Sequence, residues 1–454
     1  MPSRHDPAAS LLLTDLYQLN MLQAYLEQGK TQPAVFEFFV RTLPARRGFL
    51  MAAGLEQALD FLEGLRVTPR ELDWLRGTGR FSEAALSWLA GLRFAGEVDA
   101  VPEGTAVFGD EPILRVVAPL PMAQLVETRL INILHFQTLV ASKAARMVLA
   151  APGKRLVDFG LRRAHGSEAG LFAARAAYAA GFDGTATTLA GALWDIPLYG
   201  TMAHSFVQAF DDEAAAFEAF AHARPDGLIL LIDTYDTEAA AHKVVALAPK
   251  LAAAGIRIQG VRLDSGDLVA LSKSVRRILD DGGLKDVTLF ASGGLDEDDL
   301  LAFAAAGAPI DGYGLGTSLT TSSDAPALDC AYKLEEYAGT ARRKRSTGKA
   351  TWPGRKQVWR TYGPDGRMAG DRLSTEDDAP AGEPLLKPVM RAGRRIAPSP
   401  TLAEIRETAA QTLARLPEPL RRLEAYDYAV EVGEPLKRLA EAVDRRLARQ
   451  EAPA

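Results

Sequence analysis

Strand-like and helix-like segments alternate from about residue 155 to residue 314, and this alternation constrains the fold more than any other feature of the sequence. Helical stretches such as 238–254 and 296–306 are each followed by a glycine, which is typical of a helix end. The strand-like runs lie at 155–160, 182–187, 197–202, 228–233, 257–264, 287–292 and 310–314. This spacing predicts a parallel sheet, and seven units favour an α/β barrel or near-barrel over an open sheet.

The segments on either side of this region predict a second, α+β domain with its own small sheet. A strand is expected at 34–40, and short strands separated by turns are expected between 96 and 117. After Ser323 the strand-like runs 331–337 and 357–362 indicate that the chain returns to this sheet. Apolar residues at helical spacing then predict two C-terminal amphipathic helices.

These patterns give three predicted domains. They are an N-terminal α+β domain at 1–121, whose sheet is rejoined by 331–395, a catalytic α/β barrel at 122–330, and a C-terminal helical segment at 396–454.

Composition excludes several classes of protein. The single cysteine, Cys330, permits neither an intrachain disulfide nor a cysteine zinc site. The net charge of −6 argues against a general nucleic-acid binder. The sequence lacks an apolar run long enough for a membrane span and shows no signal-peptide pattern at its start, so we expect no membrane association and a cytoplasmic location.

Ligands of α/β barrels bind at the carboxyl ends of the strands. The residues that follow the seven predicted strands are, in order, Arg162, Arg163 and His165; Thr185, Thr187 and Thr188; Thr201, His204 and Ser205; Asp233, Thr234, Tyr235 and Asp236; Arg262, Asp264, Ser265, Gly266 and Asp267; Ser292, Gly293 and Gly294; Gly314, Gly316, Thr317 and Ser318. Arginine, aspartate, histidine and paired glycines recur here, which predicts a site for a charged ligand.

Two consecutive strand ends carry glycine-rich loops, Ser292-Gly293-Gly294 and Gly314-Leu315-Gly316-Thr317. Glycines let backbone N–H groups approach a phosphate closely. Each loop alone is equally consistent with an ordinary tight turn. As a pair at the last two strands they favour phosphate binding.

The carboxylate of Asp264 is a candidate ligand for Mg²⁺ or for ribose hydroxyls, whereas Asp267 is expected to cap the following helix. One of the adjacent Arg162 and Arg163 is expected to bind phosphate or carboxylate, and the other to be structural. The residues do not define a complete metal site.

His204 has two readings. It is either a buried histidine bonded to a backbone carbonyl, or a proton shuttle or nucleophile toward phosphorus at a strand end. The basic stretch 342–360 is read either as a solvated hairpin or as a surface that attracts polyphosphates.

Six motifs together resemble the nicotinate phosphoribosyltransferase family. They are Thr14-Asp15-Leu16-Tyr17-Gln18, Phe36-Glu37-Phe38-Phe39-Val40-Arg41, Phe159-Gly160-Leu161-Arg162-Arg163-Ala164-His165-Gly166, Gly200-Thr201-Met202-Ala203-His204-Ser205, Arg262-Leu263-Asp264-Ser265-Gly266-Asp267 and Gly314-Leu315-Gly316-Thr317. The resemblance implies a type II phosphoribosyltransferase fold with an incomplete α/β barrel. It also implies a homodimer with the active site near the subunit boundary.

The resemblance implies an ATP-dependent ligase of NAD salvage. Nicotinate, phosphoribosyl pyrophosphate, ATP and water would give nicotinate mononucleotide, pyrophosphate, ADP and phosphate, with Mg²⁺ as cofactor. His204 matches the histidine that the family phosphorylates from ATP, and Arg162 and Asp264 join it as catalytic candidates. Tyr17, Thr201 and Arg262 match nicotinate-binding positions. The predicted phosphoribosyl pyrophosphate site consists of Ser292, Gly293, Gly294, Gly314, Gly316 and Thr317.

Three alternatives remain open at this point. A nicotinamide phosphoribosyltransferase would share most of these motifs, although the Tyr17 and Arg262 pair favours the acid. A sugar-phosphate aldolase or isomerase would need a lysine or glutamate at a strand end, and the predicted strand ends contain neither. A non-catalytic relative is expected to have lost His204, Arg262 or the glycine loops.

Overall fold

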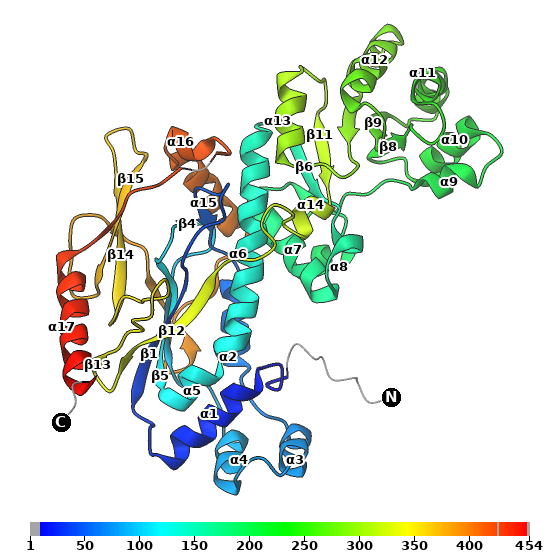
Figure 1. Cartoon of the computed structure of the whole chain (residues 1–454). Helices are drawn as coiled ribbons and strands as arrows, with labels where there is room; N and C mark the ends of the chain where they lie inside the picture. Colours follow the sequence, from blue (N-terminus) through cyan, green and yellow to red (C-terminus); the bar gives the residue numbers. More distant parts are fainter. Residues whose placement is uncertain (1–9, 425, 452–454) are drawn as a thin grey trace. The chain divides into compact units, whose positions relative to one another are not determined.

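The chain forms two compact units in the computed structural model, which describes residues 10–424 and 426–451 (Figure 1). The first unit combines the described residues up to Ser142 with those from Ala327 onward, and the second unit is 143–326. The division falls inside helix α6 (Glu127–Ala150) and not at the predicted boundary after Pro121, because α6 continues without a break. The segment 396–451 belongs to the first unit by its contacts.

The second unit is an α/β half-barrel. Its six strands are β6 (Arg155–Asp158), β7 (Gly184–Thr185), β8 (Leu228–Leu231), β9 (Ile258–Leu263), β10 (Thr288–Ala291) and β11 (Gly312–Leu315). They pair in the order β7-β6-β11-β10-β9-β8, and every pair is parallel. The intervening helices are η2 (Leu161–Arg163), α7 (Ser167–Ala179), α8 (Thr188–Trp194), α9 (His204–Gln208), α10 (Glu213–Ala223), α11 (Thr237–Ala253), α12 (Leu268–Asp281), α13 (Glu297–Ala305) and α14 (Thr317–Thr320). The predicted incomplete barrel is confirmed, with six strands in place of about seven.

The predicted strand at 197–202 is wrong. Only an isolated parallel bridge joins Leu198 to Thr185. Thr185 N donates to Pro197 O, and Tyr199 N donates to Thr185 O, both at 3.0 Å. The ladder stops there because Pro197 has no N–H to donate and β7 is only two residues long. The sheet therefore stays open between this segment and β8.

The first unit contains a seven-stranded sheet in the order β13-β12-β1-β5-β3-β17-β18. Its strands are β1 (Pro33–Val40), β3 (Glu97–Ala100), β5 (Pro112–Pro119), β12 (Cys330–Tyr337), β13 (Thr340–Ala341), β17 (Lys387–Arg391) and β18 (Arg394–Arg395). β12 lies antiparallel to β1 (Figure 1), so the chain rejoins the N-terminal sheet after the half-barrel. β1 is buried along almost its whole length, which explains its run of apolar residues on both faces.

Shorter elements complete the first unit. Two small sheets are formed by β2 (Leu50–Met51) with β4 (Ala106–Val107), and by β14 (Lys356–Tyr362), β15 (Met368–Thr375), β16 (Glu383–Pro384) and β19 (Val430–Val432). The helices are α1 (Leu16–Glu27), α2 (Leu55–Glu63), α3 (Pro69–Gly77), α4 (Glu83–Ala90), α5 (Leu120–Leu125), α15 (Leu402–Arg415), α16 (Glu418–Arg421) and α17 (Glu434–Glu451).

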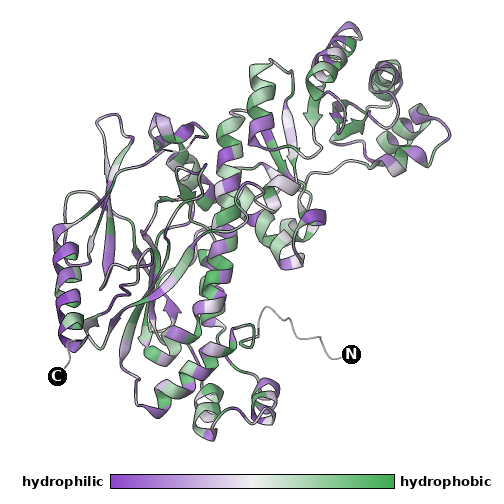
Figure 2. Cartoon of the chain, in the orientation of Figure 1, coloured by the Kyte–Doolittle hydropathy of each residue, from purple (hydrophilic) through white to green (hydrophobic). Residues whose placement is uncertain are grey.

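Helix α17 shows how the C-terminal segment is held. Leu436, Ala440 and Val443 are buried at helical spacing, and α17 packs on β15. Hydrophilic residues occupy much of the rest of the helix (Figure 2). The C-terminal helices therefore stabilise the first unit.

The basic stretch 342–360 is largely paired within the first unit. Arg343 and Arg345 lie 3.3 and 3.6 Å from the carboxylate of Asp444 on α17. Arg355 pairs with Glu336 at 3.2 Å. These contacts favour the structural reading of the stretch over a polyphosphate-attracting surface.

A buried group of ionisable side chains lies on β1, β12 and β14. Lys356 Nζ is 2.7 Å from Glu37 Oε2 and 3.8 Å from Glu335 Oε2, and all three side chains are buried. Burial raises the pKa of Glu335 to about 8, which the charge of Lys356 opposes. Glu335 is therefore protonated in the folded protein at neutral pH.

We expect Glu335→Gln to stabilise the protein increasingly as the pH rises from about 5 to about 8. In the wild type, the folded state keeps the proton of Glu335 while the unfolded chain ionises at about pH 4.3, so rising pH favours unfolding by at most about 1.4 kcal/mol per pH unit. Glutamine mimics the neutral acid and lacks this penalty. Thermal melting across the pH range measures the effect, with Glu431→Gln as control, because the Glu431 side chain on β19 is exposed. A gap between variant and wild type that does not change with pH would contradict the prediction.

Candidate active site

Arg262 is the centre of a polar cluster in the second unit. It lies near the carboxyl end of β9, and its side chain is 14% exposed. Nη1 donates to Thr201 Oγ1 at 3.0 Å, Nε donates to Ser292 Oγ at 3.1 Å, and Nη2 donates to Asp264 Oδ1 at 3.3 Å. Residues predicted at the ends of three strands are thus brought together around one guanidinium, although the segment before Thr201 is not a strand.

Phe159 is part of this cluster, and the sequence analysis missed it as a site residue. Its ring centroid lies 5.8 Å from Arg262 Cζ, within the range of a cation–π contact. Phe159 immediately follows β6, whereas the predicted strand continued to Gly160 and the candidate site residues began at Arg162. Because β6 ends two residues before the predicted strand end, Phe159 was assigned to the strand interior and was not considered as a site residue.

His204 begins α9 and is available to a ligand. Its Nδ1 lies 3.2 Å from Thr234 Oγ1, and its Nε2 lies 4.0 Å from Asp264 Oδ2. The side chain is 39% exposed, and its hydrogen-bond partner is a threonine hydroxyl. A buried histidine bonded to a backbone carbonyl, the first of the two interpretations, is therefore not what the structure contains. The imidazole is thus held through one nitrogen while the other faces the carboxylate side of the cluster.

Asp233 and Asp264 form an acidic pair across the ends of β8 and β9. Asp233 Oδ2 accepts from Asp264 N at 2.9 Å and from Ser265 Oγ at 2.6 Å. Asp233 Oδ1 is buried and has no hydrogen-bond partner among the described residues. Oxygen ligands suit Mg²⁺, which is commonly held by one or two carboxylates and substrate phosphates. Within the described ranges no three acidic, histidine or cysteine side chains gather into a complete metal site.

The loop after β10 requires glycine for a steric reason. Gly293 has φ +111°, and a Cβ at this position would lie 2.1 Å from the carbonyl oxygen of Asp264. Gly294 also has a positive φ, and both glycines are exposed. Ser292 is buried and donates to Asp264 Oδ1, which ties this loop to the Arg262 cluster.

The two parts of the second glycine-rich loop, Gly314-Leu315-Gly316-Thr317, differ in their environment. Gly314 lies inside β11 and is buried, and a Cβ there would lie 2.5 Å from the Phe159 ring. Its small size therefore serves packing. Gly316 and Thr317 follow the strand, and Thr317 is exposed at the start of α14. The exposed part of the loop, and not Gly314, is positioned to meet a ligand.

Among the described residues of the second unit, the other predicted site residues donate no hydrogen bond to Arg262 and accept none from it. Arg162, Arg163 and His165 are exposed in and after η2, and Arg162 has no hydrogen bond or ion pair within the described part of the chain. Asp267 caps α12 by accepting from Ala270 N at 3.0 Å, as expected. Tyr17 belongs to the first unit, where it is half exposed on α1, and burial together with Glu127 and Asp15 raises its pKa.

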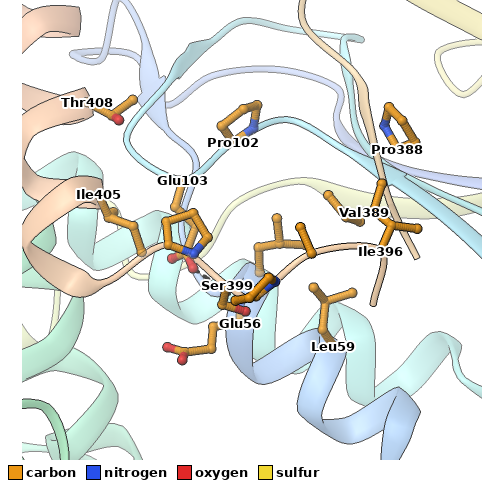
Figure 3. A pocket seen from close by; sticks show the side chains of 14 residues that line it. Glu56, Leu59, Pro102, Glu103, Pro388, Val389, Ile396, Ser399, Ile405 and Thr408 are labelled. Atoms are coloured by element: carbon orange, nitrogen blue, oxygen red, sulfur yellow. Dashed lines mark hydrogen bonds between the residues drawn. The ribbon is translucent and has the colours of Figure 1, made fainter. Parts of the chain in front are cut away.

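A separate cavity of about 260 Å³ lies in the first unit (Figure 3). It is lined mainly by proline and aliphatic side chains, with the carboxylates of Glu56 and Glu103 on its wall. Glu103 accepts from the backbone N–H groups of Gly54 and Glu56, at 2.7 and 3.1 Å. None of the described lining residues is a lysine, arginine or histidine, so this cavity is poorly suited to an anionic ligand.

The fold and the cluster define the class of the protein. It is an α/β half-barrel protein with a site of polar and ionisable side chains at the carboxyl ends of its parallel strands, where ligands of such folds bind.

Sequence comparison identifies the family. The chain matches the N-terminal domain of nicotinate phosphoribosyltransferase over residues 12–135, the family proper over 154–350, and its C-terminal domain over 380–440. A nicotinate phosphoribosyltransferase of Mycobacterium tuberculosis is 50% identical over 428 residues, 93% of this chain and 91% of the relative. One of Bacillus subtilis is 41% identical over 375 residues, 81% and 76% of the two chains. The chain belongs to the nicotinate phosphoribosyltransferase family, and the predicted resemblance is confirmed.

Structural comparison agrees with this assignment. The crystal structure of human nicotinic acid phosphoribosyltransferase superimposes with a TM-score of 0.84 at 31% identity, over 95% of this chain and 99% of the human chain. In the described ranges, helices that combine the length and the apolar character of a membrane span are absent.

Proposed function

We propose that this protein joins nicotinate to phosphoribosyl pyrophosphate in NAD salvage, with ATP consumed through a phosphohistidine at His204. The observation that carries the proposal is the Arg262 cluster, in a chain that belongs to this family. A guanidinium, two hydroxyls and a carboxylate converge there beside an aromatic ring.

Arg262 supplies the cation that a carboxylate substrate needs. Three of its five N–H groups are already used by Thr201, Ser292 and Asp264, which fixes the plane of the guanidinium. The remaining N–H groups are donors suited to the nicotinate carboxylate, and the Thr201 hydroxyl, whose present bond to Met202 O is long at 3.4 Å, can turn to donate to it as well. Phe159 beside the guanidinium offers an apolar surface for a flat ring. Tyr17 is a further proposed nicotinate contact, by resemblance.

The exposed glycine loops are the proposed phosphate sites. At Gly293, Gly294 and Gly316 a ligand can approach the backbone N–H groups without side-chain interference, and Thr317 N follows them at the start of α14. Arg162 adds an exposed cation at a neighbouring strand end. These groups would hold phosphoribosyl pyrophosphate so that its anomeric carbon meets the pyridine nitrogen of nicotinate.

The glycosyl transfer needs little covalent help from the protein. The bond between the pyridine nitrogen and the anomeric carbon forms as the bond to pyrophosphate breaks, and pyrophosphate carries away the electron pair. Asp233, with its unpartnered Oδ1, and Asp264 fit the role of holding Mg²⁺. Bound Mg²⁺ would neutralise charge on the leaving pyrophosphate.

ATP is proposed to act through His204 Nε2. Nδ1 is occupied by Thr234, so Nε2 is the nitrogen free to attack the γ-phosphorus of ATP, with ADP as the leaving group. Water later cleaves the phosphorus–nitrogen bond and releases phosphate. The phosphorylated imidazole would add negative charge and acceptors beside Asp264, which we infer changes substrate affinity during the cycle.

A direct assay tests the proposed reaction. The protein is incubated with phosphoribosyl pyrophosphate, Mg²⁺ and either nicotinate or nicotinamide, with and without ATP. We expect mononucleotide from nicotinate and more of it with ATP. A faster reaction with nicotinamide would show that the amide, and not nicotinate, is the substrate. Absence of product from both would overturn the proposal.

Labelled ATP tests the role of His204. We expect an acid-labile phosphate on the wild type and more than about tenfold less label on His204→Ala, because the attacking nitrogen is gone. His242→Ala serves as control, since His242 is exposed on α11. Label that persists on His204→Ala would assign phosphorylation to another residue.

The proposed assembly is a homodimer with its site near the subunit boundary. In the second unit, several large apolar side chains around the site loops are exposed, among them Leu161, Leu189, Leu193 and Leu198, each between 44% and 54%. Leu13, Leu16 and Tyr17 of the first unit are also exposed. A second copy of the chain would remove such surfaces from water.

Mixing two inactive variants tests this assembly. Tyr17→Ala and Arg262→Ala are each expected to be impaired. If a site is shared between subunits, each mixed dimer has one intact site of two, so an equimolar mixture after subunit exchange should regain about a quarter of wild-type activity. Light scattering measures the oligomeric state in parallel. A monomeric, fully active chain would contradict the proposed dimer.

A further inference from the structure

A buried carboxylate outside the Arg262 cluster lies beneath two of the site loops. Asp158 is the last residue of β6, and its side chain is buried. Oδ1 accepts from Gly160 N at 2.8 Å, and Oδ2 accepts from the hydroxyl of Thr185 at 2.7 Å. The Thr185 oxygen in turn accepts from Thr187 N at 2.9 Å. One carboxylate thus connects the chain after β6 to the chain after β7.

These bonds fix both loops at the points where they leave the sheet. The loop after β6 begins with Phe159, whose ring lies beside Arg262, and continues to Arg162. The loop after β7 begins at Thr185, which also forms the single bridge to Leu198, three residues before Thr201. Asp158 therefore sits under the backbone that carries Phe159 and under the backbone that leads to Thr201.

A third loop abuts the same turn. A Cβ at Gly160 would lie 1.7 Å from Thr320 Oγ1, so Gly160 packs directly against α14, the helix after the second glycine loop. Phe159 N also donates to Leu315 O at 2.8 Å, at the end of β11. The position of the Gly160 turn, which Asp158 holds, is thus coupled to the loop that begins at Gly316.

The carboxylate is costly to bury, and no cationic side chain offsets that cost among the described residues. Burial raises the pKa of Asp158 to about 6, and the bonds from Thr185 and Gly160 oppose the shift. A carboxylate accepts on both oxygens, whereas an asparagine amide has one accepting end. An ionised aspartate can therefore accept from both donors, Gly160 N–H and Thr185 O–H. An asparagine at this position can accept from only one of them.

We propose that Asp158 is a positioning residue for the reaction proposed above. It aligns Phe159 and the loops after β6, β7 and β11 around the substrates without touching them. The inference rests on the proposed function. It adds a residue whose effect on catalysis passes through the Gly160 amide and the Thr185 hydroxyl.

Four variants test the proposal. Asp158→Asn removes one of the two acceptors, Thr185→Val removes the hydroxyl donor, and Thr185→Ser restores that hydroxyl. Asp311→Asn is the control: Asp311 is exposed, but like Asp158 it accepts from a backbone amide, Leu289 N, and it lies at the opposite end of the sheet. Steady-state kinetics, melting temperature and amide hydrogen exchange are measured on each full-length protein.

We expect Asp158→Asn and Thr185→Val to lower kcat/KM by about tenfold or more, and Thr185→Ser and Asp311→Asn to stay within about twofold. Amide exchange should accelerate over 159–166 and 186–194 in Asp158→Asn but not in Asp311→Asn. Equal losses in Asp158→Asn and Asp311→Asn, or unchanged activity and exchange in Asp158→Asn, would overturn the proposal. An inactive wild type would instead overturn the proposed function, and the exchange data would still decide whether Asp158 holds the two loops.

Discussion

Replacing Arg262 with lysine is expected to lower kcat/KM for nicotinate by about 10²- to 10³-fold, corresponding to about 2.7–4 kcal/mol of lost transition-state binding. Lysine keeps the positive charge but cannot reproduce the planar fork that donates to Thr201, Ser292 and Asp264. The loss should therefore exceed what the charge alone explains.

Arg276→Lys is the matched control for this measurement. Arg276 also makes several bonds in the second unit, from Nε to Asp280 Oδ1 at 2.9 Å and from Nη2 to Leu284 O at 2.7 Å. It lies on α12, away from the carboxyl ends of the strands. Its variant should lose stability but keep kcat/KM within about twofold. Similar kinetics for Arg262→Lys and wild type would contradict the assigned role of Arg262 in nicotinate binding.

Arg360→Met is expected to cause the largest loss of stability, about 3–5 kcal/mol, because it leaves a buried charge without its partner. Arg360 and Asp371 are fully buried and joined by a two-pronged ion pair between β14 and β15. Arg360 also donates to Ala106 O at 2.9 Å, and Tyr428 donates to Asp371 Oδ1 at 3.2 Å. Burial and the charge of Asp371 raise the pKa of neighbouring Glu111, and Arg360 opposes that shift, so Arg360→Met removes the cation that offsets both acids.

Two further variants distinguish the cost of leaving Asp371 buried without its cation from the cost of losing any arginine. Arg372→Met on the same strand pair breaks an exposed ion pair with Glu431 and should cost less than about 1 kcal/mol. The double change Arg360→Met with Asp371→Leu removes both buried charges and should be more stable than Arg360→Met alone. Urea or thermal unfolding measures all three. A double variant less stable than Arg360→Met would show that the aspartate has a separate stabilising role.

Much of the site could be predicted from the sequence, because ligands of α/β barrels bind at the carboxyl ends of the strands and those ends can be located along the chain. Arg262, Asp264 and Ser292 were expected at strand ends, and the structure joins the three by hydrogen bonds. Thr201 was also expected at a strand end; the segment before it is not a strand, yet its hydroxyl accepts from Arg262. The sequence predicts a phosphate loop at Gly293, whereas its close approach to the carbonyl of Asp264, which leaves no room for a side chain, is seen only in the structure.

Other features depended on packing that no local pattern reports. Gly314 looked like part of a phosphate loop, yet it is buried in β11 to accommodate the Phe159 ring. The run at 197–202 had strand-like composition, but β7 is too short to extend the pairing beyond Leu198. Asp158 was not predicted as a site residue, because Thr185 comes within hydrogen-bond distance of it only when β6 and β7 pair, and Gly160 only when the chain turns after β6.

The sequence by itself determined the alternation of strands and helices, the family and the residue types at the strand ends, because these depend on local periodicity and motifs. Only the tertiary structure decided which side chains converge on Arg262, which glycines face solvent, and that a buried aspartate joins two loops. The physical reason is that hydrogen bonds and close packing act between residues far apart in the chain, and only their spatial arrangement defines those partners.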